Sequence, residues 1–231
     1  RPASGPAAPL SPTSAADAAG ALAARCAALP AVAPEVSATP VTPRFDETRS
    51  LAELTAMYER ASDLHETMGL TQTELGYATR LAANGLRDGD RGVCMRVAVS
   101  VTIAMAPMTV FVAREIAADA CRHAAVRSHE MRHVKVHAWF LRDAPARLAA
   151  RLAAADVGRV RHAASAEALQ AEAAAEVEAI IAAAQDVDRA LLAAMQREVD
   201  TPAEYARVSA LCDTASLPVR ADGVRVPADR R

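Results

Sequence analysis

The stretch VCMRVAVSVTIAM, residues 93–105, carries the clearest β-strand signal in the chain. Its odd-numbered residues are all apolar, while polar residues such as Arg96 and Thr102 stand between them. This alternation predicts a strand with one buried face. Pro107 predicts a turn, after which residues 108–114 return as a partner strand. We therefore expect a β-hairpin over residues 93–114.

Segments upstream of this hairpin add further strand signals. Residues 71–83 alternate in the same way and predict another strand. Residues 32–43 are rich in proline and predict extended or edge-strand structure. Residues 85–92 are charged and contain three glycines, so a loop is expected there.

Helical patterns occupy most of the remaining chain. The expected helices cover residues 15–29, 51–62, 119–155, 165–199 and 202–212. The second of these has the sharpest start, because Ser50 and Glu53 are spaced as a capping box. Val157-Gly158 separates the two long helices, and Pro202 is suited to the first turn of the last one.

Strands followed by helices are typical of an α+β fold. We expect a small antiparallel sheet, made of the hairpin and the upstream strands, packed on the long 119–155 helix and on an antiparallel helix after it. The predicted organisation is a lead-in over 1–30, largely disordered with one short helix, a single domain over 31–213, and a flexible tail over 214–231.

Composition excludes several classes of function. The net charge of −2 over 231 residues gives no general attraction to nucleic acid. The longest uncharged run, residues 97–113, contains a proline and is short for a membrane span. The sequence therefore predicts neither a nucleic-acid partner nor a transmembrane segment.

Four widely spaced cysteines lack any CxxC pair. An even number with this spacing fits two disulfides in an oxidising compartment, which predicts a periplasmic or secreted protein. The alternative is four buried free thiols. Of the three pairings, we expect Cys94–Cys121 and Cys26–Cys212, because the first would clamp the hairpin to the helix that follows.

The segment SHEMRH, residues 128–133, contains the pattern HExxH inside an expected helix. Two histidines four residues apart, His129 and His133, lie one turn apart on one helix face and can reach one ion at ~2.0–2.1 Å. Glu130 would lie beside that ion, where a carboxylate can accept a proton from water and pass it to a leaving amine. The spacing predicts a zinc-peptidase type of site with Zn²⁺ as the cofactor.

A catalytic zinc site needs a third protein ligand. No third histidine follows at the distance that one class of such enzymes requires, so a carboxylate from a later helix is expected. The candidates are Asp186, Asp188, Glu198, Asp200 and Glu204. A helix folding back at Gly158 would favour Asp188, whereas the turn that starts the last helix favours Glu204. Our prediction is Glu204, with Asp188 and Asp200 as alternatives, and Tyr205 either packs there or assists an oxyanion.

Other interpretations of the histidine-rich helix are open. Four of the six histidines lie between residues 123 and 137, and such a face can be solvated or satisfied within a core. His137 lies ~12 Å from His129 along a straight helix, too far to share its ion, so a structural role is expected. A di-iron bundle would need a second ExxH unit, and only Glu130–His133 has that spacing.

The residues around the motif also resemble a known family. The runs from Met108 to Glu115 and from Val126 to Val134, with Cys121 between them, resemble uncharacterised bacterial secreted proteins identified as zinc-dependent proteases of the HExxH type. The resemblance extends over about residues 26–212 and is sharpest over 93–134.

That resemblance implies that His129 and His133 are metal ligands and that Glu130 is the base. The family often ends its domain with an aspartate-containing turn that carries a further histidine. The matching turn here has Asp200 and Glu204 and no histidine, so the third ligand departs from the family's pattern.

Two functions of different classes follow from these observations. The first is a zinc metallopeptidase that hydrolyses peptide-type amide bonds in a peptide or protein substrate, with Glu130 as general base and residues 108–114 as the strand that holds the substrate. The second is a non-catalytic interaction protein of the cell envelope that retains a metal-binding or vestigial HExxH helix.

Overall fold

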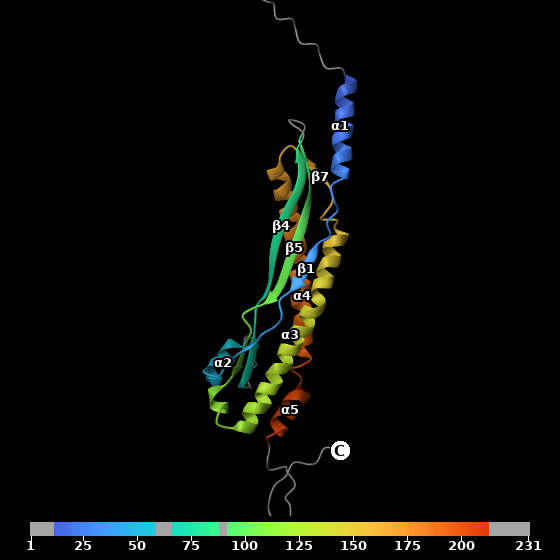
Figure 1. Ribbon diagram of the computed structural model, residues 1–231. Coiled ribbons are helices and arrows are strands. Elements are labelled where there is room, and N and C mark those ends of the chain that lie inside the picture. Colours follow the sequence, from blue (N-terminus) through green and yellow to red (C-terminus); the bar gives the residue numbers. More distant parts are fainter. Residues whose placement is uncertain (1–11, 59–65, 88–91, 213–231) are drawn as a thin grey trace, which may run out of the picture. The chain divides into compact units, whose positions relative to one another are not determined.

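A computed structural model describes residues 12–58, 66–87 and 92–212, with side chains from residue 20 onward. Its elements are mixed α and β, as predicted (Figure 1). In order they are α1 (Pro12–Ala27), β1 (Glu35–Ala38), β2 (Arg44–Asp46), α2 (Leu51–Met57), β3 (Gly69–Gln72), β4 (Leu75–Arg87), β5 (Val93–Met105), β6 (Thr109–Val112), η2 (Arg114–Ile116), α3 (Ala120–Ala154), β7 (Arg161–Ala163), α4 (Ala166–Arg197) and α5 (Pro202–Ala210). The α+β prediction is confirmed.

Contacts divide the chain into two compact units. Unit 1 comprises residues 1–36, 79–101 and 146–184, and unit 2 comprises residues 37–78, 102–145 and 185–231. The expected boundaries at residues 30 and 213 stay predictions. Residues 1–11 of the lead-in and the whole 214–231 tail lie outside the described residues, whereas α1 occupies most of the remaining lead-in.

The strand at the centre of the sequence argument forms as expected. Every odd-numbered residue of β5 is buried, and Ser100 and Thr102 are exposed. One sheet has the order β1-β5-β4, and β7 also pairs with β5. The predicted 71–83 strand is instead two strands, β3 and β4, and β4 extends through part of the expected loop to Arg87.

The expected hairpin over 93–114 is wrong. β6 lies in a second sheet of order β2-β6-β3, parallel to β2 and antiparallel to β3. Alternation predicts that a segment is a strand but not which strand it pairs with, because the backbone groups that pair are the same in every strand. Since β6 is the central strand, its backbone is already paired on both sides, and the prediction that 108–114 holds a substrate is wrong as well.

In unit 1, a disulfide joins Cys26 to Cys94, and both cysteines are fully buried. They pack with Leu29 and with the partly buried Leu22 and Leu86. The second disulfide, in unit 2, joins Cys121 to Cys212. Two disulfides are thus confirmed, but the expected pairing is wrong, because the hairpin that Cys94 was to clamp does not exist and the start of β5 packs on the end of α1 instead.

A buried arginine ties the segment after α3 to α4 within unit 1. The Arg161 side chain is 2% exposed and donates to Glu176 at 2.6 Å, to Glu172 at 3.1 Å and to the Val157 carbonyl at 3.1 Å. Glu176 also accepts from Arg159 at 2.8 Å. The expected break after α3 is therefore held by charge as well as by chain geometry.

Replacing Glu176 by alanine is expected to lower the free energy of unfolding by about 2–4 kcal/mol, because it leaves a buried guanidinium short of its best partner. Glu172 is the matched control, since its side chain is 60% exposed and its removal should cost less than about 1 kcal/mol. Urea unfolding of the two variants measures both values. Equal losses would show that burial of Arg161 does not decide the outcome.

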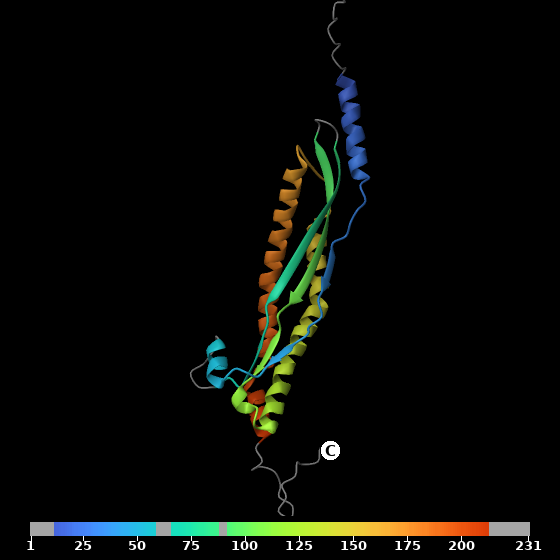
Figure 2. The ribbon, with the colours of Figure 1, turned by 60° about the vertical axis from the view of Figure 1, so that its left-hand side comes forward.

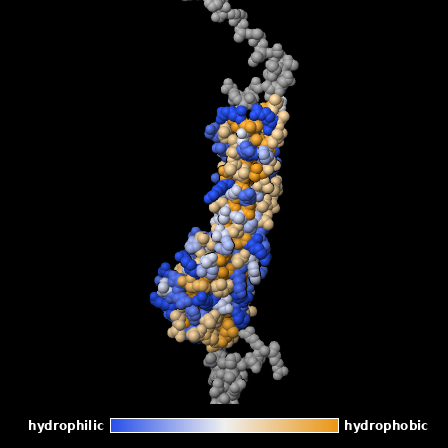
Figure 3. Space-filling model, viewed as in Figure 1, coloured by the Kyte–Doolittle hydropathy of each residue, from blue (hydrophilic) through white to orange (hydrophobic). Residues whose placement is uncertain are grey.

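In unit 2, α2 and the second sheet share one core. Leu54, Phe111 and Val112 are buried there together with Ile116 and Val126. The capping box starts α2 as predicted: the Ser50 hydroxyl accepts from the Glu53 N–H at 3.2 Å, and the Ser50 N–H donates to the Glu53 carboxylate at 2.7 Å. Hydrophilic residues cover most of the surface in the region of α2 (Figure 3), as expected for a helix that turns its apolar side chains inward.

The three later helices match their expected ranges within two residues at every end. α5 lies beside the N-terminal half of α3 in both ribbon views (Figure 1 and Figure 2). Thr201 caps α5 through the Glu204 N–H, and Pro202 occupies its first turn. None of the described helices is both long and apolar enough to cross a membrane.

Candidate metal centre

The predicted motif lies in the N-terminal half of α3, inside unit 2. His129, Glu130 and His133 are 7%, 4% and 9% exposed. One ligand atom from each lies within 4.8 Å of the others. The long helix fixes this arrangement, because residues four apart occupy the same face one turn on. The expected grouping of the three side chains on one helix is thus observed.

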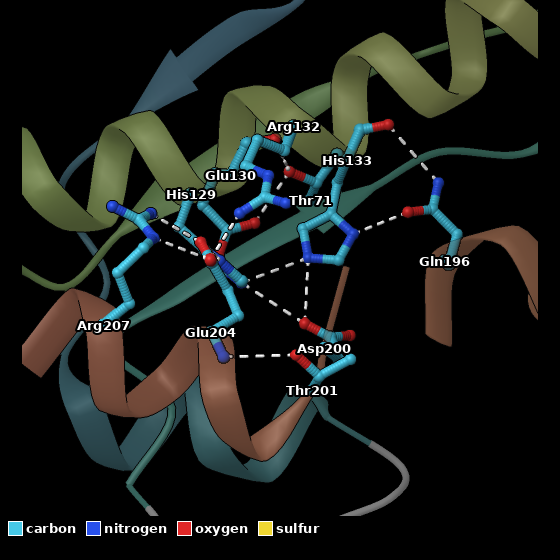
Figure 4. A network of polar contacts seen from close by, with 10 residues as sticks. All are labelled: Thr71, His129, Glu130, Arg132, His133, Gln196, Asp200, Thr201, Glu204 and Arg207. Carbon is cyan, nitrogen blue, oxygen red and sulfur yellow. Dashed lines mark hydrogen bonds and ion pairs between the residues drawn. The ribbon is translucent and has the colours of Figure 1, made fainter. Parts of the chain in front are cut away.

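Asp200 completes a compact triangle with the two histidines (Figure 4). Its Oδ1 atom lies 3.3 Å from His129 Nε2 and 3.1 Å from His133 Nε2, and the two Nε2 atoms are 3.3 Å apart. Ligands that surround a tetrahedral ion at ~2.0–2.1 Å are themselves about 3.3 Å apart. The three atoms therefore have the spacing of one face of a tetrahedral metal site.

The opposite nitrogens of both rings are held by acceptors. His129 Nδ1 lies 3.3 Å from Glu204 Oε1, and His133 Nδ1 lies 2.6 Å from Gln196 Oε1. The Gln196 amide nitrogen donates to the His133 carbonyl at 3.4 Å, which orients the amide oxygen toward the ring. Because carboxylate and amide oxygens only accept, both rings donate from Nδ1 in the tautomer that keeps Nε2 free to bind a metal.

This tautomer leaves both Nε2 lone pairs pointing at the Asp200 carboxylate. Three acceptors at 3.1–3.3 Å repel one another unless a cation lies between them. Burial would lower the pKa of His133, but the Asp200 hydrogen bond and the charge of Glu130 outweigh it and raise that pKa. The site therefore attracts positive charge, either a proton or a metal ion.

Asp200 is an ionised ligand candidate. Burial would raise its pKa, but the hydrogen bonds to His129 and His133 hold the pKa of Asp200 well below the usual range. Tyr205, half exposed and tilted against the His129 ring, also lowers the pKa of this carboxylate. Tyr205 therefore packs against His129, which is one of the two roles expected for it.

Glu204, the expected third ligand, lies on the Nδ1 side of His129, away from the Nε2 triangle. It is 7% exposed and accepts from Arg207 at 2.6 Å and from Arg132. The Arg207 hydrogen bonds, more than the Arg132 contact, hold the pKa of Glu204 well below its usual value. The geometry thus gives Glu204 the position of a residue that orients a ligand, and Asp200 the position of a ligand.

The remaining carboxylate candidates are engaged elsewhere. Asp188 is buried and accepts from the Tyr77 hydroxyl at 2.6 Å. Asp186 is exposed and pairs with Arg189, and Glu198 is exposed. α4 faces His133 through Gln196 and not through Asp188, so the fold-back argument placed the contact about two turns too early along α4.

Two residues of β3, Gly69 and Thr71, position the Glu130 carboxylate. The Thr71 hydroxyl donates to Glu130 Oε2 at 2.8 Å. A Cβ on Gly69 would lie 2.6 Å from Glu130 Oε1 and 2.7 Å from Val126 Cγ1, so only glycine lets the carboxylate approach this strand. Burial raises the pKa of Glu130, against the lowering influence of His133 and Thr71. A buried carboxylate with a raised pKa beside a cation site is suited to moving protons.

If the centre binds a metal and Glu130 serves as a base in hydrolysis, Gly69→Ala is expected to retain the metal and to lower hydrolysis by about 10- to 100-fold, because a base displaced by roughly 1 Å loses its alignment. Gly76→Ala is the matched control, since a Cβ there meets nothing within 4 Å. Metal content by elemental mass spectrometry and cleavage of a peptide mixture measure the two effects. Unchanged cleavage by the Gly69 variant would show that this seat does not position the base.

His137 is buried, as its expected structural role requires. Burial and the neighbouring His133 lower the pKa of His137 to about 4, so the ring is neutral at neutral pH. Its Nδ1 atom finds no hydrogen-bond partner among the described residues. Nothing brings it into the Nε2 triangle, in agreement with the distance argument from the sequence.

Sequence reasoning did not find several residues of this centre. They are Gly69, Thr71, Arg132, Gln196 and Arg207. Helical spacing offered a signal for two of them, because Arg132 follows His129 by three residues and Arg207 follows Glu204 by three. The other three lie 59 or more residues from their partners along the chain and carried no local signal.

Comparison with known proteins adds no assignment: no protein-family model, no curated protein and no solved structure matches this chain. The resemblance to secreted HExxH proteins therefore stays a prediction.

Proposed function

We propose that this protein is a zinc-dependent hydrolase of peptide-type amide bonds. The observation that carries the proposal is the triangle of His129 Nε2, His133 Nε2 and Asp200 Oδ1, with edges of 3.1–3.3 Å, beside the buried Glu130. Two imidazoles and one carboxylate are the ligand set of a common class of hydrolytic zinc sites. The donor set and its spacing therefore fit Zn²⁺.

The ligands are oriented by their outer contacts. Glu204 fixes the His129 ring and Gln196 fixes the His133 ring, so both present Nε2 to one point. Such partners set the tautomer and raise the basicity of the ligand. Zinc bound at that point would supply Lewis-acid chemistry, polarising the scissile carbonyl and lowering the pKa of a water molecule.

Glu130 has the position of the proton carrier. Its carboxylate lies near the two histidine nitrogens and is held from the other side by Thr71. We assign it the acceptance of a proton from the attacking water and the return of that proton to the leaving amine nitrogen. The raised pKa of Glu130 favours that return, because the protonated form is easier to reach at neutral pH.

The substrate is assigned to β3 in place of the strand expected from the sequence. β3 lies at one edge of the described β2-β6-β3 sheet and carries both residues that seat Glu130. An extended peptide can add to such an edge through main-chain hydrogen bonds. This strand would align a peptide bond beside the proposed base and metal.

A periplasmic or secreted location is part of the proposal. Two disulfides support it, since such bonds persist in oxidising compartments. The alternative of a non-catalytic envelope protein was motivated by the lack of a clear third ligand. Asp200 fills that position in our assignment, so we favour the hydrolase.

Elemental mass spectrometry of purified wild type beside His133→Ala tests the proposal. We expect about one zinc per chain in the wild type, lost in the variant, together with peptide cleavage that depends on zinc. Lack of zinc in the wild type after reconstitution would overturn the metal site. Stoichiometric iron in place of zinc would overturn the hydrolytic assignment, because the same ligand set also serves iron oxygenases.

A further inference from the structure

The two disulfides of this chain differ in exposure. Cys26 and Cys94 are fully buried, whereas Cys121 is exposed and Cys212 half-buried. A thiolate must reach a sulfur atom to exchange with a disulfide. A reductant in solution can therefore attack Cys121–Cys212 while the Cys26–Cys94 bond stays shielded.

The exposed disulfide joins α3, the helix that carries both histidines, to the end of α5, the helix that carries Glu204. Cys121 lies in the first turn of α3, eight residues before His129, and Cys212 follows the end of α5. α5 begins at Pro202, between Asp200 and Glu204. The bond thus links the helix that carries both histidines to the helix that carries Glu204, the carboxylate that contacts His129 Nδ1.

α5 has little else to hold it in place. Glu204 is its only buried residue, and a helix of nine residues is marginal by itself in water. Its first turn is held by the Glu204 contacts with His129 and Arg132. Its far end is held by the disulfide, since the side chains of its last turn are exposed or half-buried.

We propose that the Cys121–Cys212 disulfide is a redox switch that sets the metal affinity of the His129–His133–Asp200 centre. The inference rests on the proposed metal site. A dithiol reductant transfers two electrons and two protons: its thiolate attacks one sulfur, its second thiol closes a cyclic disulfide, and Cys121 and Cys212 leave as thiols. The Glu204 contacts with His129 and Arg132 then hold α5 without the second attachment at its far end, and they no longer fix Glu204 against His129.

The test measures the zinc dissociation constant by competition with a fluorescent chelator. The samples are the oxidised chain, the chain after mild reduction with iodoacetamide capping and removal of reagents, and Cys121→Ser/Cys212→Ser. Capping prevents the freed thiols from binding zinc themselves. Mass spectrometry identifies which cysteines are capped, and amide hydrogen exchange follows residues 202–210 and 120–145.

We expect zinc binding to weaken about 10- to 100-fold in both altered forms, the range for loss of a partner that orients a ligand. Exchange should accelerate over 202–210 and stay slow over 120–145, with Cys26 and Cys94 uncapped. An affinity within twofold of the oxidised chain overturns the switch while leaving the proposed function intact. Capping of all four cysteines together would also overturn the switch, and so would loss of hydrogen-exchange protection throughout α3. If the oxidised chain binds no zinc, the proposed function and the switch both fall.

Discussion

Asp200→Ala is expected to remove zinc from the purified protein almost completely, whereas Glu204→Gln should only weaken binding. The first change deletes the oxygen that lies 3.1–3.3 Å from both Nε2 atoms. The second keeps an acceptor near His129 Nδ1 but removes the charge that fixes the ring. Loss of such an orienting partner costs about 10- to 100-fold in affinity, and loss of a direct ligand costs more.

Isothermal titration with zinc, in competition with a chelator, separates these two outcomes. Asp200→Asn is a useful third variant, because it keeps the size of the side chain and removes its negative charge. The unfolding midpoint without metal should change little in Asp200→Ala, which distinguishes ligand loss from misfolding. If Glu204→Gln abolishes binding and Asp200→Ala does not, the ligand is Glu204, as the sequence alone indicated.

Glu130→Gln is expected to keep its zinc and to lower the rate of amide hydrolysis by about 10²- to 10⁴-fold, the range that general-base catalysis supplies. The glutamine amide has nearly the same shape and can still meet the Thr71 hydroxyl, but it cannot accept a proton from water. Metal content should stay near the wild-type value, because none of the three triangle atoms belongs to Glu130.

Cleavage of a peptide mixture, followed by mass spectrometry, measures this loss. Glu198→Gln makes the same chemical change at an exposed position on the chain after α4 and serves as the matched control. Residual cleavage at the wild-type rate in Glu130→Gln would mean that Glu130 is not the base. A loss of zinc together with activity would instead make Glu130 a ligand.

Local sequence patterns predicted the helices well. The capping box at Ser50 and Glu53 and the proline at position 202 each act through the backbone of adjacent residues. At the predicted break, glycine is required at position 158 because a Cβ there would lie 2.8 Å from the Val32 carbonyl oxygen. Such signals are legible in sequence because both partners lie within a few residues or the residue type itself is restricted.

The pairing of the strands could not be predicted from local sequence patterns. Residues 93–105 and 108–114 both looked like strands, and their closeness in sequence favoured a hairpin. The structure pairs β6 with β2 and β3, and places β5 in the other sheet. The disulfide error has the same origin, because Cys94 was assigned a partner on the strength of a hairpin that does not form.

The sequence by itself determined the half of the metal centre that one helix supplies. His129, Glu130 and His133 are brought together by a rise of ~1.5 Å and a turn of 3.6 residues, and any α-helix over this segment would do the same. Tertiary structure alone decided the other half. Asp200 and Gln196 lie 63–71 residues from the histidines, and the disulfide partners lie 68 and 91 residues apart. Their approach depends on how α5 and α4 pack against α3. A contact that moves by four residues along a helix moves by about one whole turn. That packing, and not the spacing of residues in the chain, places Asp200 at the Nε2 atoms and Glu204 behind His129.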